Sequence, residues 1–165
     1  MAELEHHGYY RAMKRHLFTL ELAESVDLPT ALDLPSPHFG CMIAWDARGA
    51  SVDQVSALVD PLIKLGAVYF CVWGPDCERV HDIVDESDPY ADTVIMTTWH
   101  DKESLEEALW FFLNSTWPDD HFEQTFRAGL AISVGSSSWA DAMRVALRDP
   151  KGFSESVSRH RHGDA

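Results

Sequence analysis

Two short apolar segments decide the fold: residues 39–45 (FGCMIAW) and residues 67–73 (AVYFCVW). Nearly every residue in both segments is apolar, as in strands that are covered on both faces of a parallel sheet. Between them, Ser51 offers an N-cap and Gly66 a C-cap for a helix with an apolar stripe. A buried strand, a helix and a second buried strand in this order are typical of a βαβ unit.

The same alternation continues further along the chain. Residues 93–99 (TVIMTTW) and 130–134 (LAISV) are predicted as a third and a fourth strand, each followed by a helix. Continuous apolar strands separated by helices predict an α/β fold with three layers. Because crossover connections are right-handed, few topologies remain. We expect a mostly parallel four-stranded sheet in the flavodoxin-like order 2-1-3-4.

The flanking segments differ from this core in character. Residues 9–24 contain apolar side chains at helical spacing and neither proline nor glycine, so they are predicted as a helix. Three prolines between residues 26 and 40 would interrupt both helices and strands. The expected organisation is an N-terminal helical arm with a proline-rich connector at 1–38, an α/β domain at 39–150 and a flexible polar tail at 151–165.

Composition excludes several classes of protein. The chain has 165 residues and a formal net charge of −14, which disfavours binding to nucleic acid or to anionic membranes. It contains no 18-residue apolar run and does not open with a secretory signal, so we expect neither a transmembrane helix nor secretion. The three cysteines show no metal-binding spacing and are expected to be reduced thiols of a cytoplasmic protein.

The negative charge is concentrated in the middle of the chain. Residues 41–149 hold nineteen acidic and seven basic residues, a net charge of −12. Scattered carboxylates usually serve solubility. A surface of one sign also raises the association rate with a partner of opposite sign. A basic protein is therefore a candidate partner.

Polar and aromatic residues follow the predicted strands, where α/β proteins bind their ligands. In the order 2-1-3-4 the strand order reverses between the first and third strands, so Arg48 is expected to face His100 across a crevice. The candidate ligand-binding residues are Trp45, Asp46, Arg48, Trp99, His100, Ser136 and Ser137. The alternative for these residues is structural, because such tryptophans pack under helices and such Asp and Ser residues cap them.

Motifs that would identify an enzyme are missing from the sequence. There is no phosphate-binding glycine loop, no G-x-S-x-G elbow and no H-E-x-x-H pair. The carboxylates between residues 82 and 92 do not have the spacing of a calcium loop. Cys77 is flanked by carboxylates that raise a thiol pKa, so it is not expected to be a nucleophile. No catalytic residue, cofactor or metal ligand is predicted.

The third helix departs from ordinary amphipathic spacing. Residues 109–113 (LWFFL) place large apolar side chains on all of its sides. Such a helix is covered by further protein or forms an interface. The N-terminal arm could cover it, and so could a second copy of the chain in a homodimer or a foreign partner.

These observations support two hypotheses about function. The first is a non-catalytic acidic protein-binding module, such as an inhibitor or immunity-type protein that neutralises a basic partner. Trp110 and Phe111 would then be apolar anchors, and Asp85 and Glu86 rim carboxylates that speed association. The second is a small-molecule-binding domain or an enzyme that uses the crevice at the carboxyl ends of the strands.

Overall fold

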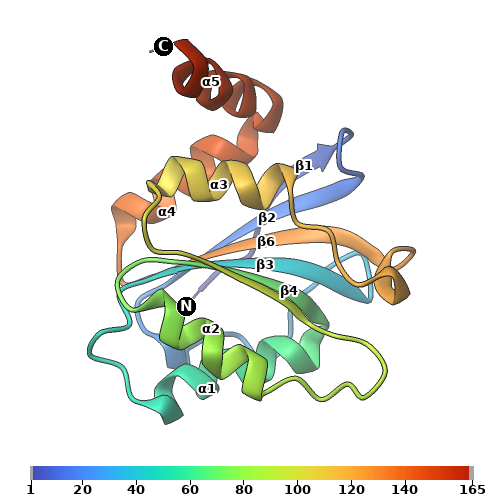
Figure 1. The fold of residues 1–165 in the computed structure, drawn as a ribbon, viewed down its shortest axis with the longest axis vertical. Coiled ribbons are helices and arrows are strands. Elements are labelled where there is room, and N and C mark those ends of the chain that lie inside the picture. Colours follow the sequence, from blue (N-terminus) through green and yellow to red (C-terminus); the bar gives the residue numbers. More distant parts are fainter. Residues whose placement is uncertain (1, 164–165) are drawn as a thin grey trace.

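A computed structural model describes residues 2–163 and shows an α/β protein built on a six-stranded sheet (Figure 1). The sheet has the order β1-β2-β6-β3-β4-β5, and every neighbouring pair is parallel except β1 and β2. The strands are β1 (Glu5–Tyr10), β2 (Arg15–Leu22), β3 (His38–Trp45), β4 (Ala67–Trp73), β5 (Met96–His100) and β6 (Phe126–Val134).

Helices cover both faces of this sheet, as the sequence predicts. α1 and α2 lie on one face and α3 and α4 on the other, while α5 packs outside α3 and α4 (Figure 1). The helices are α1 (Val52–Leu65), α2 (Cys77–Glu86), α3 (Leu105–Asn114), α4 (Ser137–Arg148) and α5 (Pro150–Gly163), with short 3-10 turns η1 (Ser25–Asp27) and η2 (Asp120–Phe122).

The apolar strands fill two separate cores, one on each face. In β3, Cys41 and Ile43 pack on the α1 and α2 side, whereas Met42 and Ala44 pack on the side of α3 and α4. Since successive side chains of a strand point to opposite faces, a strand that is covered on both faces must be apolar throughout. This confirms the interpretation of the continuous apolar runs as buried strands.

The predicted four-stranded, flavodoxin-like order 2-1-3-4 is wrong. The four strands foreseen from the sequence are β3, β4, β5 and β6, and they lie in the order 4-1-2-3. β6 is buried along almost its whole length and occupies the middle of the sheet, beside β3. β5 has the sequence MTTWH, carries two threonines and lies at the edge. Burial of the more apolar strand therefore decides which of the two is central.

The predicted N-terminal helical arm is also wrong, because β1 and β2 form a hairpin in its place. β2 pairs with β6 in parallel, from His16 opposite Ala128 to Leu22 opposite Val134. This pairing buries Leu17 on one face of the sheet and Phe18 on the other. A helix would bury one stripe only, so the strand buries more of these apolar side chains. β2 is consequently part of the central sheet.

The predicted flexible tail forms a helix as far as Gly163. α5 packs against α3, where Asn114 Nδ2 donates a hydrogen bond of 2.9 Å to Ser154 Oγ. The Arg161 guanidinium lies 5.6 Å from the centre of the Trp110 ring. α5 therefore covers part of the apolar surface of α3 that the sequence leaves without a partner.

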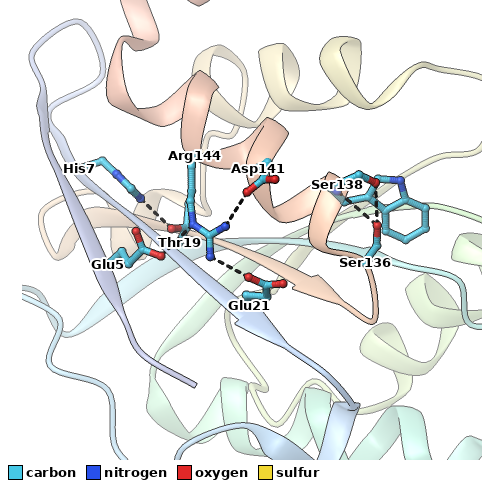
Figure 2. Close-up of polar contacts among 9 residues, drawn as sticks. Glu5, His7, Thr19, Glu21, Ser136, Ser138, Asp141 and Arg144 are labelled. Atoms are coloured by element: carbon cyan, nitrogen blue, oxygen red, sulfur yellow. Dashed lines mark hydrogen bonds and ion pairs between the residues drawn. The ribbon is translucent and has the colours of Figure 1, made fainter. Parts of the chain in front are cut away.

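Arg144 joins α4 to the N-terminal hairpin (Figure 2). Its guanidinium donates hydrogen bonds of 2.8 Å to both Glu21 and Glu5, and one of 3.0 Å to Asp141 on its own helix. The hydrogen bonds to Glu21, the largest cause, and to Glu5 raise the pKa of Arg144. One side chain thus holds α4, β1 and β2 together.

We predict that Arg144→Ala lowers the free energy of unfolding by about 1–2 kcal/mol, because three partly exposed charge-assisted contacts are lost together. Urea denaturation measures the change. Arg148→Ala is the matched control, because Arg148 is exposed in the last turn of the same helix, where a cation contributes only about 0.3–1 kcal/mol, so the loss should be smaller than that of Arg144→Ala. Equal losses in the two variants would contradict the assigned role of Arg144.

Candidate functional site

The strand order reverses between β3 and β6, and a cavity lies there. α1 follows β3 on one face of the sheet and α4 follows β6 on the other, so the two connections diverge. Ligands of open α/β sheets bind at such a point. The cavity has a volume of about 360 Å³, and its lining includes Trp45, Asp46, Val134 and Gly135 from the strand ends, together with residues 23–26.

Of the candidate ligand-binding residues, Trp45 and Asp46 line this cavity. Trp45 is mostly buried in the core on the α1 side. Asp46 accepts two hydrogen bonds from the Arg48 guanidinium, of 2.9 Å from Nε and 2.7 Å from Nη2, and one of 3.3 Å from the Arg48 backbone N–H. These bonds lower the pKa of Asp46 and raise that of Arg48. Asp46 and Arg48 form an exposed ion pair, so Arg48 is poorly suited to bind an acidic ligand.

The serines that follow β6 act as a helix cap. Ser136 is the N-cap of α4, and its Oγ accepts a hydrogen bond of 3.3 Å from the backbone N–H of Trp139. Ser136 Oγ also lies 3.1 Å from Ser138 Oγ (Figure 2). Ser137 is exposed in the first turn of the helix. The structural alternative therefore accounts for Ser136.

Trp99 and His100 lie on β5 and are not part of this cavity's lining. β4 separates β5 from β3, so His100 does not face Arg48 across a crevice as the sequence suggests. Two strand spacings amount to roughly 10 Å between backbones. The expectation depends on the predicted strand order and fails with it.

His100 takes part instead in a hydrogen-bonded network that the sequence does not reveal. Its Nε2 lies 3.2 Å from Cys71 Sγ and 3.0 Å from Thr98 Oγ1, and its Nδ1 lies 3.0 Å from Glu103 Oε1. Since a carboxylate only accepts hydrogen bonds, Nδ1 donates to Glu103. In the neutral ring Nε2 then accepts from the hydroxyl or the thiol. A thiol, an imidazole and a carboxylate are thus in contact in the same order as in enzymes that use a cysteine nucleophile.

Burial gives this network a structural role. Cys71 is fully buried and His100 nearly so. Burial also raises the pKa of the Cys71 thiol, so the thiolate that would attack a substrate is disfavoured. The network joins β4, β5 and the N-terminal end of α3, which fixes the edge strand to the rest of the sheet. No local sequence pattern marks this network, because its residues come together only when β4 pairs with β5 and Cys71 lies opposite Thr98.

The apolar surface of α3 is covered from within the chain. Trp110 is half-buried beneath Arg161, and the Phe111 ring lies 4.7 Å from the His100 ring. Residues 9–24 contribute to the cover of α3, since Tyr10 and Leu17 share its core and Tyr10 Oη donates a hydrogen bond of 2.7 Å to Asn114 Oδ1. α5 and β5 cover Trp110 and Phe111. Trp110 and Phe111 are consequently weak candidates for anchors, and a homodimer through α3 loses its main argument. Asp85 and Glu86, in contrast, are exposed in the last turn of α2.

The arrangement defines a class of protein, a small α/β sandwich whose sheet is covered by helices on both faces. A family model matches residues 17–150, which is most of the chain, and the chain belongs to this family, described as a domain of unknown function (DUF7684). No curated protein and no solved structure matches the chain significantly. Among residues 2–163, no helix has the length and apolar character needed to span a membrane.

We predict that none of the three thiols reacts rapidly in the folded protein. Cys41 and Cys71 are fully buried, Cys77 is nearly so, and burial raises the pKa of each thiol. At about pH 8 a thiol reagent should therefore label the native protein far more slowly than a free cysteine. Denatured protein is the control and should take up one label per cysteine. Fast, stoichiometric labelling of Cys77 in the native state would show that this thiol is accessible and reactive.

Proposed function

We propose that the protein is a non-catalytic binding module that receives a basic, extended segment of a partner protein along β5. The observation that carries the proposal is the distribution of charge around this strand. Residues 78–107, which comprise α2, β5 and the start of α3, hold ten acidic and two basic residues. Their net charge of −8 is more than half of the −14 of the whole chain.

β5 itself has the features of a strand that accepts another strand. It pairs only with β4, and no described strand lies along its outer side. An open edge offers backbone donors and acceptors to an added strand. Two apolar side chains of β5 are partly exposed, Met96 (38%) on the face of α3 and α4 and Trp99 (41%) on the face of α1 and α2, and Val94, just before the strand, is 51% exposed. Exposed apolar side chains with an acidic surround suit an extended partner segment that contains both apolar and basic residues.

The charges at the end of α2 support a role in binding. Asp85 and Glu86 lie in the last turn of the helix, which contains no basic residue. A helix carries partial negative charge at its C-terminus, so each acidic residue there costs about 0.3–1 kcal/mol of stability. His81 offsets part of this cost only when protonated, because its Nε2 lies 3.5 Å from Asp85 Oδ2. Carboxylates that weaken their own helix are readily explained if a basic partner uses them.

Two parts of the surface around β5 would contribute differently to binding. The carboxylates attract a basic partner over about 10 Å at 0.1 M salt and raise the rate of association. The apolar side chains and the backbone of β5 would hold the bound segment and slow its dissociation. Neutralisation of a basic protein in the cytoplasm, as by an inhibitor or immunity-type protein, is the activity that fits this division best.

The test uses a defined probe, an octapeptide that alternates lysine with valine, and a counterpart in which glutamate replaces lysine. Association and dissociation rates are measured between about 0.05 M and 0.3 M salt. We predict that the lysine peptide binds and that Asp85→Asn with Glu86→Gln slows its association several-fold, with dissociation nearly unchanged. Trp99→Ala should instead speed dissociation.

A matched control removes two exposed carboxylates outside residues 78–107, by Asp33→Asn with Asp60→Asn. This variant should keep nearly the full association rate. Equal slowing in both double variants would show a general effect of net charge and contradict a β5 site. Equal binding of the lysine and glutamate peptides would contradict the basic partner.

A second prediction follows from the helix C-terminus. Asp85→Asn with Glu86→Gln should raise the free energy of unfolding by about 0.5–2 kcal/mol, because two unfavourable interactions with the helix dipole are removed. Urea denaturation at about pH 8 measures the change. The Asp33 and Asp60 control should change stability by less than about 0.5 kcal/mol. A loss of stability in the first variant would mean that these carboxylates stabilise the fold.

Small-molecule binding between β3 and β6 is a second candidate function, favoured by the position of the 360 Å³ cavity. Thermal shift measurements with a panel of small ligands test it. Ala23 lines this cavity, and Ala23→Leu would fill part of it. A ligand bound here should lose its thermal shift in that variant. A shift that persists in Ala23→Leu would place the ligand elsewhere.

A further inference from the structure

A cavity of about 460 Å³ at the amino ends of β2 and β6 has the opposite electrostatic character from β5. The turn between β1 and β2 lies at this end of the sheet, as does η2 (Figure 1). Three basic side chains, Lys14, Arg15 and Arg127, line the cavity together with the carboxylates Asp120 and Glu123. The charged lining is therefore net positive in a chain of net charge −14.

Arg15 is a buried cation without a counter-charge. It is 4% exposed, and its guanidinium donates hydrogen bonds only to Thr116, of 2.7 Å to Oγ1 and 2.5 Å to the backbone oxygen. Its Nε is buried and has no hydrogen-bond partner. No carboxylate among residues 2–163 lies within ion-pair distance of it. Burial, with a smaller contribution from Arg127, lowers the pKa of Arg15 to about 10.

The neighbouring cations are also without acidic partners in the described part of the chain. Arg127 donates hydrogen bonds of 2.8 Å to the backbone oxygen of Glu123 and 3.0 Å to that of Phe126, which are neutral acceptors. Lys14 is exposed in the turn before β2. Arg48, Arg79 and Arg144, in contrast, form ion pairs with carboxylates. The charged lining of the cavity thus has a net charge of +1, and none of its three cations forms an ion pair among the described residues.

Aromatic rings complete the site. The guanidinium of Arg15 lies 4.6 Å from the centre of the Phe126 ring and 5.7 Å from that of Trp117. Trp117 lines the cavity and is 62% exposed, which is unusual for so large an apolar side chain. An exposed ring beside cations can stack on the flat body of a ligand. The volume lies within the usual range for small-molecule sites.

We propose that this cavity binds a small organic oxyanion, a carboxylate or a phosphate ester carried on a flat ring. The oxyanion would lie against Arg15, Lys14 and Arg127, and the ring would stack on Trp117. A buried cation costs several kcal/mol of desolvation, and an apolar side chain of similar volume often serves a purely structural role equally well. A bound anion would accept hydrogen bonds from donors that lack a partner, such as Arg15 Nε, and this would explain why the fold keeps a buried cation here.

This site is independent of the proposed function. The cavity lies at the amino ends of β2 and β6, whereas β5 forms the far edge of the sheet, beyond β3 and β4. The acidic surround of β5 also repels the anions that this cavity would attract. Failure of one proposal therefore leaves the other standing.

The test is isothermal titration calorimetry of the full chain with phenyl phosphate, benzoate, inorganic phosphate and benzyl alcohol. We expect phenyl phosphate or benzoate to bind and benzyl alcohol not to bind, because the alcohol lacks the charge. Lys14→Gln with Arg127→Gln should weaken binding at least about tenfold by removing two charged donors. Arg148→Gln with Lys151→Gln, two exposed cations outside the cavity, is the matched control and should bind as the unaltered chain does.

Two further variants separate the parts of the site. Arg15→Met should abolish binding. If Arg15→Met does not fold, the variant Lys14→Gln with Arg127→Gln tests the site instead. Trp117→Ala should weaken binding of phenyl phosphate and leave that of inorganic phosphate unchanged. Absence of binding by every anion up to about 10 mM, or equal losses in the control variant, would overturn the proposal. Equal affinities for phenyl phosphate and inorganic phosphate would overturn the ring-binding part.

Discussion

The parallel pairing of β6 with both β2 and β3 is the constraint on which the rest of the structure depends. β6 is the last strand in the chain and is inserted between two earlier ones, so α3 must cross the sheet on the face opposite α1 and α2. Its nearly complete burial contributes to both cores. The N-terminal hairpin joins the sheet through β6, because β2 pairs with it.

The candidate sites follow from this one insertion. β3, β4 and β5 extend outward in chain order, so β5 becomes an edge with the acidic α2 beside it. The reversal of strand order falls between β3 and β6, where the 360 Å³ cavity lies. The pairing of β2 with β6 also brings Arg15 beside Phe126, which creates the basic cavity at the other end.

The sequence predicts those parts of the fold that depend on local patterns. Continuous apolar runs identify β3, β4 and much of β6, and the Ser51 and Gly66 caps bound α1 as expected. The hairpin is missed because its turn contains Lys14 with a φ of 57°, where no glycine marks it. The strand order depends on which strands gain most from burial, a property of the whole sheet. The site residues on β5 are misplaced for the same reason, since His100 meets Cys71 only when β5 pairs with β4.

The most direct test of the account is to locate the bound lysine and valine peptide on the protein by NMR. If β5 accepts an added strand, the largest backbone amide shifts should fall in residues 94–100, with intermolecular contacts between peptide and strand backbones. Amides on the outer side of β5 should also become protected from hydrogen exchange. Shifts centred on α1 or on the cavity between β3 and β6, with β5 unchanged, would contradict the account.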